Sequence, residues 1–324
     1  MPAGPAMQTD SRTATAPRRR DAATVSLEDL LQLARPAEAL PLKAGSIRAL
    51  QGGTYTAPFK GRGMEFDETR PYQPGDDIRN LDWKVTARTG KTHTKLFREE
   101  RERPVLLWLD LRQPMFFATH GAFKSVIASE AAALLAWSAV AHRDRVGGLI
   151  FSEQSHRELR PQSGKTAALK FLKTLCLHPQ WRQPPVPPQI SFQDSARSAL
   201  LRLHNVARPG SLIFLLSDFR GFTPELETHV ASIARHNDLV LVHVADRLEY
   251  ELPPAGRYTL RGDAREIRID TGDARAREAH RQRFESHRAY LQALCLRYRM
   301  FYLQCGTGDN PVRVLQNGLG LKRR

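Results

Sequence analysis

Two aspartates that end apolar runs of the sequence are the residues best placed to do chemistry. Asp110 closes the run VLLWLD (105–110), and Asp218 closes SLIFLLSD (211–218). Carboxylates at the mouths of buried strands often mark a site, because their oxygens can hold a cation or bind a polar partner. Asp110 is followed at the next two alternate positions by Arg112 and Pro114, so the kind of site is an open question.

Strands and helices alternate through the part of the chain that carries these aspartates. The expected strands are VLLWLD (105–110), VGGLIF (146–151), SLIFLLSD (211–218), LVLVHVAD (239–246) and MFYLQC (300–305). The expected helices cover about 123–141, 166–177, 193–207, 224–236 and 274–298, and RYTLRG (257–262) is a candidate edge strand. Because the strands are apolar almost without interruption, the pattern predicts an α/β fold with a mostly parallel central sheet and helices on both faces.

The carboxyl ends of parallel strands meet at one edge of a sheet, and ligands of open α/β sheets bind beyond that edge. Asp110 and Asp218 are therefore expected to come together in one crevice. Ser152, which follows VGGLIF, and the loop GTGD (306–309), which follows the last strand, face the same edge.

Changes of composition along the chain predict five segments. Residues 1–23 are rich in Ala, Pro, Thr and Arg and read as a disordered tail, and residues 24–44 hold a short helix that begins at Ser26. Residues 45–103 are punctuated by glycine and partly alternating, which indicates a small β-rich charged module. Residues 104–310 form the α/β domain, and residues 311–324 a basic tail.

The formal net charge of +15 over 324 residues is spread along the chain, with clusters at its ends, Arg18–Arg20 and Lys322–Arg324. A scattered excess favours acidic partners, either a protein or a membrane surface. Basic residues interleaved with aromatic ones, which are typical of a nucleic-acid interface, do not form a stripe in this sequence. Nucleic-acid binding is therefore disfavoured.

Cysteine content and apolar runs bear on the compartment. The three cysteines, Cys176, Cys295 and Cys305, have no CxxC spacing, which fits a reducing compartment. No apolar signal region opens the sequence, and no run reaches the roughly 18 residues of a membrane span. The nearest candidate, SVIASEAAALLAWSAVA (125–141), carries Glu130 and serines and is typical of a core helix. We expect a cytoplasmic protein without a transmembrane segment.

The segment EFDETRPYQPGDDIRNLDWKVTARTGKTHTKLFREERERPV (65–105) resembles the domain-of-unknown-function 58 family. The motifs RPYQPGDDIR, LDWK, TARTG and FREERERP carry the resemblance, and DRVGGLIF and SDF continue it more loosely. The resemblance implies a von Willebrand factor A-like domain preceded by such a module. It also implies a partnership with an ATPase of the MoxR type, in the AAA+ class, that assembles or activates other proteins, and no enzymatic reaction is established for the family.

Domains of the von Willebrand factor A type commonly carry a metal-ion-dependent adhesion site made of two aspartates, two serines and a threonine. The residues at these positions are Asp110, Arg112, Pro114, Asp218 and, for the threonine, Thr166 or Ser163. Magnesium needs oxygen ligands in near-octahedral geometry. Pro114 has no side-chain oxygen, and Arg112 places a positive charge where the cation would lie. We therefore expect a degenerate site without a cofactor, and bound Mg²⁺ is the alternative.

Arg112 has two interpretations in this setting. Two carboxylates at one edge repel each other and raise the pKa of one of them unless a cation compensates. A bidentate guanidinium supplies such a cation permanently, so Arg112 could stand in for the metal by pairing with Asp110, Asp218 or both. In the other interpretation Arg112 points to solvent and Asp110 only caps the following turn.

The module carries alternating charges in RPYQPGDDIRNLDWK (70–84). Its charged residues are Arg70, Asp76, Asp77, Arg79, Asp82 and Lys84. Because opposite charges alternate, we expect ion pairs that seat the module on the α/β domain, with Tyr72 and Trp83 as apolar anchors. A docking surface for a partner is the alternative, and the two interpretations overlap. A nuclease-like reading of these acids and Lys84 lacks support from their spacing.

These patterns predict a non-enzymatic interaction protein, or adaptor, that acts with a MoxR-type AAA+ ATPase on a client protein. The expected partner-binding residues are Asp110, Arg112 and Asp218 at the sheet edge and Arg70, Asp76, Asp77, Arg79, Asp82, Trp83 and Lys84 in the module. The alternatives are a divalent-metal-dependent phosphoesterase, which needs a coordinated ion, and a nucleic-acid-binding protein, whose affinity falls steeply with salt. Peripheral association with a membrane also fits the charge.

Overall fold

The computed structural model describes residues 21–42, 64–74, 76–99, 102–182, 191–261 and 266–320 of the chain. Most of the expected N-terminal tail, the first part of the expected β-rich module (45–63) and the last four residues lie outside the described residues.

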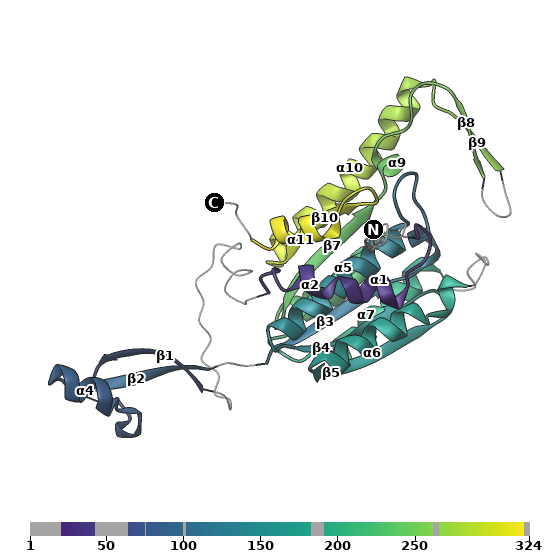
Figure 1. Ribbon diagram of the computed structural model, residues 1–324. Helices are drawn as coiled ribbons and strands as arrows, with labels where there is room; N and C mark the ends of the chain where they lie inside the picture. The colour runs from purple at the N-terminus through teal and green to yellow at the C-terminus, as the bar shows by residue number, and fades with distance from the viewer. Residues whose placement is uncertain are drawn as a thin grey trace, which may run out of the picture.

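A six-stranded sheet forms the centre of the fold, with the strand order β10–β7–β6–β3–β4–β5 (Figure 1). In that order the strands are Phe301–Gly306, Asp238–Ala245, Leu212–Ser217, Pro104–Asp110, Arg145–Phe151 and His156–Ser163. All neighbours pair parallel except β5, which pairs antiparallel with β4. This confirms the predicted fold class, a von Willebrand factor A-like α/β fold with a mostly parallel sheet.

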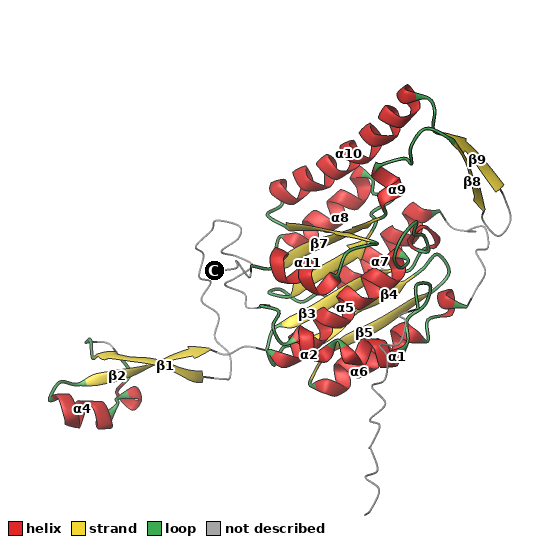
Figure 2. Ribbon diagram, turned by 45° about the horizontal axis from the view of Figure 1, so that its top comes forward, coloured by secondary structure: helices red, strands yellow, loops and turns green. Residues whose placement is uncertain are grey.

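Helices cover both faces of this sheet (Figures 1 and 2). On the first face lie α1, α2, α5, α6 and α11, which span Leu27–Gln32, Ala34–Ala37, Lys124–Ala141, Lys165–Cys176 and Pro311–Gly318. On the second face lie α7, α8 and α10, which span Phe192–Val206, Pro224–Ala234 and Ala274–Arg297. A short helix, α9 (Arg247–Tyr250), follows β7 and contacts α10.

Alternation of side chains along the buried strands produces two apolar cores, one under each layer of helices. In β3, Val105, Leu107 and Leu109 enter the core that contains α5, whereas Leu106 and Trp108 enter the core that contains α7 and α8. None of these five side chains is more than 2% exposed. Burial on both faces explains why the strand sequences are apolar almost without interruption.

Helix α5 is apolar around its circumference because protein encloses it. By length and composition α5 could cross a membrane, but 89% of it is buried inside the domain. Trp137 Nε1 donates a hydrogen bond to the carbonyl of Leu30, and Ser138 Oγ donates to the carbonyl of Leu40. These bonds tie the N-terminal segment 21–42 to α5, which is the core helix that the sequence predicts.

The strands β3, β4 and β5 approach one another closely at two glycines. A Cβ atom on Gly148 would lie 2.2 Å from the carbonyl oxygen of Leu107, and one on Gly147 would lie 2.6 Å from that of Leu159. The pairing of β4 with β5 also shifts register between Val146 and Gly148. Any larger residue at these positions would push the strands apart.

The chain end that the sequence assigns to a basic tail is helical in its described part. Helix α11 begins after Asn310, whose side chain accepts a hydrogen bond from the backbone N–H of Val312. Leu315 and Leu319 are buried in the core beside β10 and α5. The apolar residues of this eight-residue helix are too few to stand out from the basic residues around it.

Two antiparallel hairpins lie outside the six-stranded sheet. Strand β8 (Arg257–Arg261), expected as an edge strand of the main sheet, pairs instead with β9 (Glu266–Asp270). Strand β1 (Met64–Pro71) pairs with β2 (His93–Glu99), and the connection between them holds a short 3-10 turn and the helix α4 (Trp83–Thr89). The described part of the charged module is therefore a hairpin with an inserted helix. Among the described residues, 3-10 turns cover Ile78–Asn80, Gln113–Met115 and Pro179–Trp181.

Candidate binding site at the carboxyl edge of the sheet

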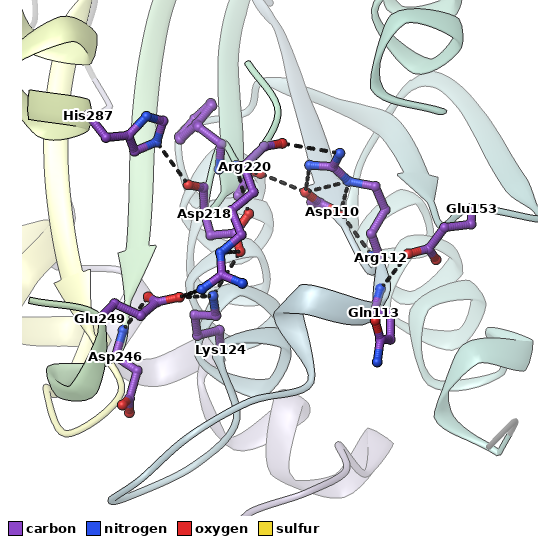
Figure 3. Close-up of polar contacts among 12 residues, drawn as sticks. Asp110, Arg112, Gln113, Lys124, Glu153, Asp218, Arg220, Asp246, Glu249 and His287 are labelled. Atoms are coloured by element: carbon purple, nitrogen blue, oxygen red, sulfur yellow. Dashed lines mark hydrogen bonds and ion pairs between the residues drawn. The ribbon is translucent and has the colours of Figure 1, made fainter. Parts of the chain in front are cut away.

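Asp110 and Asp218 end neighbouring strands at the carboxyl edge of the sheet, as the sequence predicts. Asp110 is the last residue of β3, and Asp218 directly follows β6, the parallel neighbour of β3. Both residues are buried, with exposed fractions of 0% and 3%. Figure 3 shows the polar contacts around them.

Arg112 pairs with Asp110 through its guanidinium fork (Figure 3). Arg112 Nε lies 2.9 Å from Asp110 Oδ1, and Arg112 Nη2 lies 2.6 Å from Asp110 Oδ2. The same carboxylate accepts hydrogen bonds from the backbone N–H of Arg112 and from Ser217 Oγ, at 2.9 and 2.6 Å. Arg112 is only 2% exposed, so the interpretation in which it points to solvent is wrong and the pairing with Asp110 is correct.

Burial by itself lowers the pKa of Arg112, because a charged group loses hydration. The charge of Asp110 and the hydrogen bonds between the two side chains outweigh this effect, and they raise the pKa of Arg112 above its ordinary value. The guanidinium is therefore a permanent cation at the edge of the sheet.

A second buried cation, Lys124, neutralises Asp218. Lys124 Nζ donates hydrogen bonds to Asp218 Oδ2 at 2.8 Å and to Glu249 Oε1 at 2.7 Å. Burial raises the pKa of Asp218, but the charge and the hydrogen bond of Lys124 lower it by a larger amount. The pKa of Asp218 therefore lies below its ordinary value. Lys124 was not among the site residues expected from the sequence. Its signal was a single basic residue at the start of the mostly apolar helix 124–141.

Arg220 and Glu249 extend these contacts toward the surface. Arg220 Nη2 lies 2.5 Å from Glu249 Oε1, and Arg220 Nε lies 3.6 Å from Asp218 Oδ2. The Arg220 side chain is 55% exposed. We call the resulting set the edge network: the carboxylates of Asp110, Asp218 and Glu249 and the cations of Arg112, Lys124 and Arg220. Its formal charges cancel.

Asp246, at the end of β7, holds the loops beside the edge network together. Its carboxylate accepts hydrogen bonds from the backbone N–H and the Oγ1 of Thr119, from Thr307 Oγ1 and from the backbone N–H of Leu248. Burial raises the pKa of Asp246, but these hydrogen bonds lower it below its ordinary value. Thr307 belongs to the loop GTGD (306–309), which therefore lies at the expected edge.

Thr166 and Ser163 lie at the opposite edge of the sheet. Ser163 pairs with Arg145, the first residue of β4, because β5 runs antiparallel and returns the chain to the amino edge. Thr166 follows in the first turn of α6. Their assignment to the carboxyl-edge site is wrong, because the polar strand HRELRPQS (156–163) was not recognised as a strand. Pro114 lies in the 3-10 turn after Arg112.

The residues at this edge do not fit a hydrated magnesium ion. The guanidinium of Arg112 lies against Asp110, and the ammonium of Lys124 lies against Asp218, so each carboxylate already faces a cation. Mg²⁺ needs about six oxygen ligands. Among the described residues, no group of three or more His, Cys, Asp or Glu side chains has the geometry to hold a metal ion.

A cavity of about 700 Å³ opens beside Asp218, between α9 and α10. Its apolar walls are Phe117, Leu248, Leu252 and Phe284, and its polar lining includes Arg220, His243, Glu249, His280, Arg283 and His287. A second cavity of about 410 Å³ shares Leu248 and Leu252 with the first and is lined by Pro253, Pro254 and Tyr258. Apolar walls with a few convergent polar groups are typical of binding sites.

Hydrogen bonds hold the three histidines of the larger cavity in place. His280 Nε2 lies 2.8 Å from the carbonyl oxygen of Leu248, and His243 Nδ1 lies 2.7 Å from the hydroxyl of Tyr302. His287 Nε2 lies 3.4 Å from the carbonyl oxygen of Asp218. Burial, with a smaller contribution from His287, lowers the pKa of His243 to about 3, so His243 is uncharged near neutral pH.

The charged residues of the stretch 70–84 make their described contacts within the module. Arg70 pairs with Asp76 at 2.7 Å. Asp77 caps the 3-10 turn that begins at Ile78, and Asp82 caps α4 by accepting hydrogen bonds from two backbone N–H groups. Within the stretch 70–84 the structure describes no ion pair with the α/β domain, whereas Arg103, the last residue of the module, pairs with Asp238 at the start of β7.

Trp83 is 68% exposed, so the expectation that it anchors the module as a buried side chain is wrong. Tyr72 is half-buried. A partner-docking role for this stretch stays a prediction.

A family model described as "Protein of unknown function DUF58" matches residues 68–290. Two uncharacterized proteins, from Mycobacterium bovis and Mycobacterium tuberculosis, are each 30% identical to this chain over 237 residues, which cover 71% of this chain and 72% of theirs.

Two solved structures from Bacteroides species cover 67% of this chain. One is an aerotolerance-related membrane protein from Bacteroides fragilis with multiple mutations to serines, at 15% identity, 96% coverage and a TM-score of 0.41. The other is the conserved hypothetical protein BatB from Bacteroides thetaiotaomicron, at 13% identity, 97% coverage and a TM-score of 0.39. At these TM-scores the fold assignment rests on the strand order described above.

Proposed function

The chain belongs to the DUF58 family of proteins of unknown function, and from this premise we propose that it is a non-enzymatic interaction protein. Its larger cavity binds a segment of a partner protein, and this binding needs no divalent ion. The observation that carries the proposal is the edge network. Both aspartates that a metal site would use are neutralised by buried cations of the chain itself, directly beside an open cavity.

The cavity suits a partner segment that carries an apolar side chain next to a carboxylate. Phe117, Leu252 and Phe284 offer apolar walls, and Arg220 and Arg283 bring guanidinium groups to the same cavity. A guanidinium has five N–H donors, so Arg220 can hold Glu249 and still bind a second carboxylate. Glu249, which pairs with Arg220, is also held by Lys124, so the site is already formed before a partner protein binds.

The non-enzymatic reading is supported by how the titratable groups of the edge are used. Asp110, Asp218 and Glu249 each face a cation within hydrogen-bond distance, so none of them is poised to take a proton from a substrate. Asp246 accepts four hydrogen bonds from the chain itself.

The partner and the compartment are proposed from the family. We infer that a MoxR-type AAA+ ATPase and a client protein bind this chain, and that it works in the cytoplasm. Support for the ATPase comes from the resemblance of residues 65–105 and from family membership. The client is the molecule that the cavity would recognise.

Affinity purification of the tagged full-length chain from its native cell, with and without ATP, tests the proposal. We expect an AAA+ ATPase and a client to be recovered, and we expect Arg220→Ala with Arg283→Ala to lower client recovery about tenfold, which corresponds to a loss of about 1.4 kcal/mol of binding free energy. The matched control is Lys170→Ala with Lys173→Ala, two exposed cations of α6.

Equal client recovery by the cavity variant and the control would contradict the cavity as the binding site. Repeated absence of an ATPase under gentle conditions would contradict the partnership. Elemental analysis of the purified protein provides the third readout. A stoichiometric divalent metal would contradict the metal-independent site and favour the phosphoesterase alternative.

A further inference from the structure

A second surface, outside the carboxyl edge, combines exposed apolar side chains with exposed cations. Ile78 and Trp83 are each 68% exposed, although a tryptophan is highly buried on average. Ile78 begins the 3-10 turn in the β1–β2 connection, and Trp83 is the first residue of α4. The structure describes no residue that covers either side chain.

The acidic residues of this stretch are directed to the backbone or to a neighbouring arginine. Asp76 pairs with Arg70 and also accepts a hydrogen bond from the backbone N–H of Gln73. Asp77 and Asp82 cap the 3-10 turn and α4, and Asp82 is buried. The carboxylates of these aspartates are therefore already paired with backbone N–H groups or with Arg70.

The basic residues that follow are directed to solvent. Arg79, Lys84, Arg88 and Lys91 are all exposed, and none of their side chains makes an ion pair or a hydrogen bond within the described chain. A stretch whose charges alternate in sequence thus folds so that its cations dominate the outer surface. We call Ile78, Arg79, Trp83, Lys84, Arg88 and Lys91 the basic–aromatic surface.

We propose that the basic–aromatic surface docks this protein onto a lipid bilayer that contains anionic phospholipids. An indole ring is enriched at the headgroup level of membranes, and Ile78 adds an apolar side chain next to it in sequence. Each Lys or Arg close to an anionic bilayer strengthens binding about fivefold. Four cations around two apolar side chains provide both electrostatic attraction and apolar insertion within one short segment.

The observations favour a bilayer over a protein or a nucleic acid. A standard protein interface needs roughly 20–30 residues on each side, far more than this short stretch provides. Single-stranded nucleic acids stack successive bases on several aromatic side chains, and Trp83 is the one aromatic member of this surface. A site that recognises one specific partner needs its charged side chains held in place by hydrogen bonds, and the described residues hold none of the four cations in this way. A bilayer needs only their summed charge.

The position of the surface in the hairpin agrees with docking. Helix α4 lies in the connection between β1 and β2, at the end opposite to the link from β2 to β3. Figures 1 and 2 show the hairpin and α4 apart from the six-stranded sheet. None of the surface residues lines the cavities at the carboxyl edge, so the inference does not depend on the proposed function.

Co-sedimentation of the purified full-length protein with vesicles tests the proposal. We expect binding to vesicles of phosphatidylcholine with phosphatidylglycerol, weaker binding at high salt, and little binding to phosphatidylcholine alone. Lys84→Glu with Arg88→Glu removes two cations and lowers the partition coefficient at least about 25-fold, and Trp83→Ser lowers it about tenfold. A blue shift of tryptophan fluorescence on binding is expected in the wild type and absent in Trp83→Ser.

Matched control variants distinguish binding through this surface from effects of net charge or of exposed apolar side chains elsewhere on the protein. Lys170→Glu with Lys173→Glu makes the same charge change on α6, and Leu177→Ser removes an apolar side chain that is 73% exposed. Circular dichroism confirms that each variant is folded. Equal losses in test and control variants, no binding to anionic vesicles, or tight binding of an oligonucleotide in place of vesicles would each overturn the proposal.

Discussion

Replacement of Lys124 by methionine removes one buried cation of the edge network and nearly keeps the size of the side chain. Lys124 is fully buried, and its Nζ contacts Asp218 at 2.8 Å and Glu249 at 2.7 Å. In Lys124→Met, Glu249 keeps its ion pair with Arg220. Asp218 keeps the backbone N–H of Arg220 and a 3.6 Å contact with Arg220 Nε.

Removal of one partner of a buried ion pair costs about 3–5 kcal/mol, because the other charge stays buried. Arg220 is half-exposed, so it compensates only part of this cost. We therefore expect Lys124→Met to lose about 3–4 kcal/mol in the free energy of unfolding near neutral pH, a large share of the total for a domain of this kind.

The loss depends on pH with a defined sign. In the wild type, burial raises the pKa of Asp218, but Lys124 lowers it below the unfolded value, so the stability gained is present at neutral pH and is lost as the pH falls through the folded pKa. In Lys124→Met burial acts without the cation and the pKa of Asp218 rises. The difference between the two proteins therefore shrinks as the pH falls from the raised pKa toward the lowered one.

Urea denaturation followed by circular dichroism, at neutral and at acidic pH, measures this difference. In Lys124→Met with Asp218→Asn no unpaired charge remains, so the double variant should recover most of the loss. Lys170→Met, at an exposed position of α6, should change stability by less than about 0.5 kcal/mol. A loss below about 1 kcal/mol at neutral pH, or a double variant no more stable than the single one, would refute the reasoning.

Three further predictions concern the same domain. Arg112→Ser leaves Asp110 buried without its cation and should lose about 3–5 kcal/mol in the free energy of unfolding, measured by urea denaturation. Calorimetric titration of the wild type with Mg²⁺ should show no binding. Tight binding of Mg²⁺ would contradict a guanidinium in the place of the metal. In Gly148→Ala the Cβ would lie 2.2 Å from the carbonyl oxygen of Leu107. Denaturation should show a loss of about 1–3 kcal/mol, against almost none for Gly308→Ala, where no atom lies within 4 Å, and equal losses would speak against the close packing of β3 and β4. The pKa of His243, about 3, lies below its ordinary 6.5, so the unfolded chain binds the extra proton between these values and stability falls as the pH falls through that window. His243→Gln should make the decline shallower, and an unchanged decline in a pH series would exclude His243 as its source.

The fold and the meeting of the two aspartates could be predicted because they depend on local patterns. Strands buried on both faces are apolar at nearly every position, as in VLLWLD (105–110), and such runs separated by helices specify a parallel sheet. The strand β5 could not be found in this way. It lies at the exposed edge, its sequence HRELRPQS is polar, and its antiparallel direction carries Ser163 and Thr166 away from the site.

The choice of ion-pair partners could not be predicted, because it depends on contacts between distant parts of the chain. Lys124 meets Asp218 and Glu249 across 94 and 125 residues of sequence. Arg112 needed to reach only two residues back to Asp110, so its pairing could be proposed from spacing. The alternating charges of the module were equally consistent with ion pairs and with capping aspartates.

The aspartates of the module did carry a signal for capping. Asp82 stands directly before the helix-compatible stretch WKVTART, and Asp77 stands before IRN, which are positions where a carboxylate caps a helical turn. An N-cap aspartate is occupied by backbone N–H groups. If these two aspartates had been assigned as helix caps, the sequence would have predicted that the basic side chains of the module lack acidic partners and face solvent.

The cations of the edge network are attached to the chain, and this has a consequence for control in the cell. A bound ion can be stripped by EDTA and follows the free magnesium concentration, whereas the guanidinium of Arg112 and the ammonium of Lys124 cannot dissociate. A partner held beside them would stay bound through any change in ion supply. Its release would require movement of the segments that carry these side chains, which are the turn after β3 and the first turn of α5.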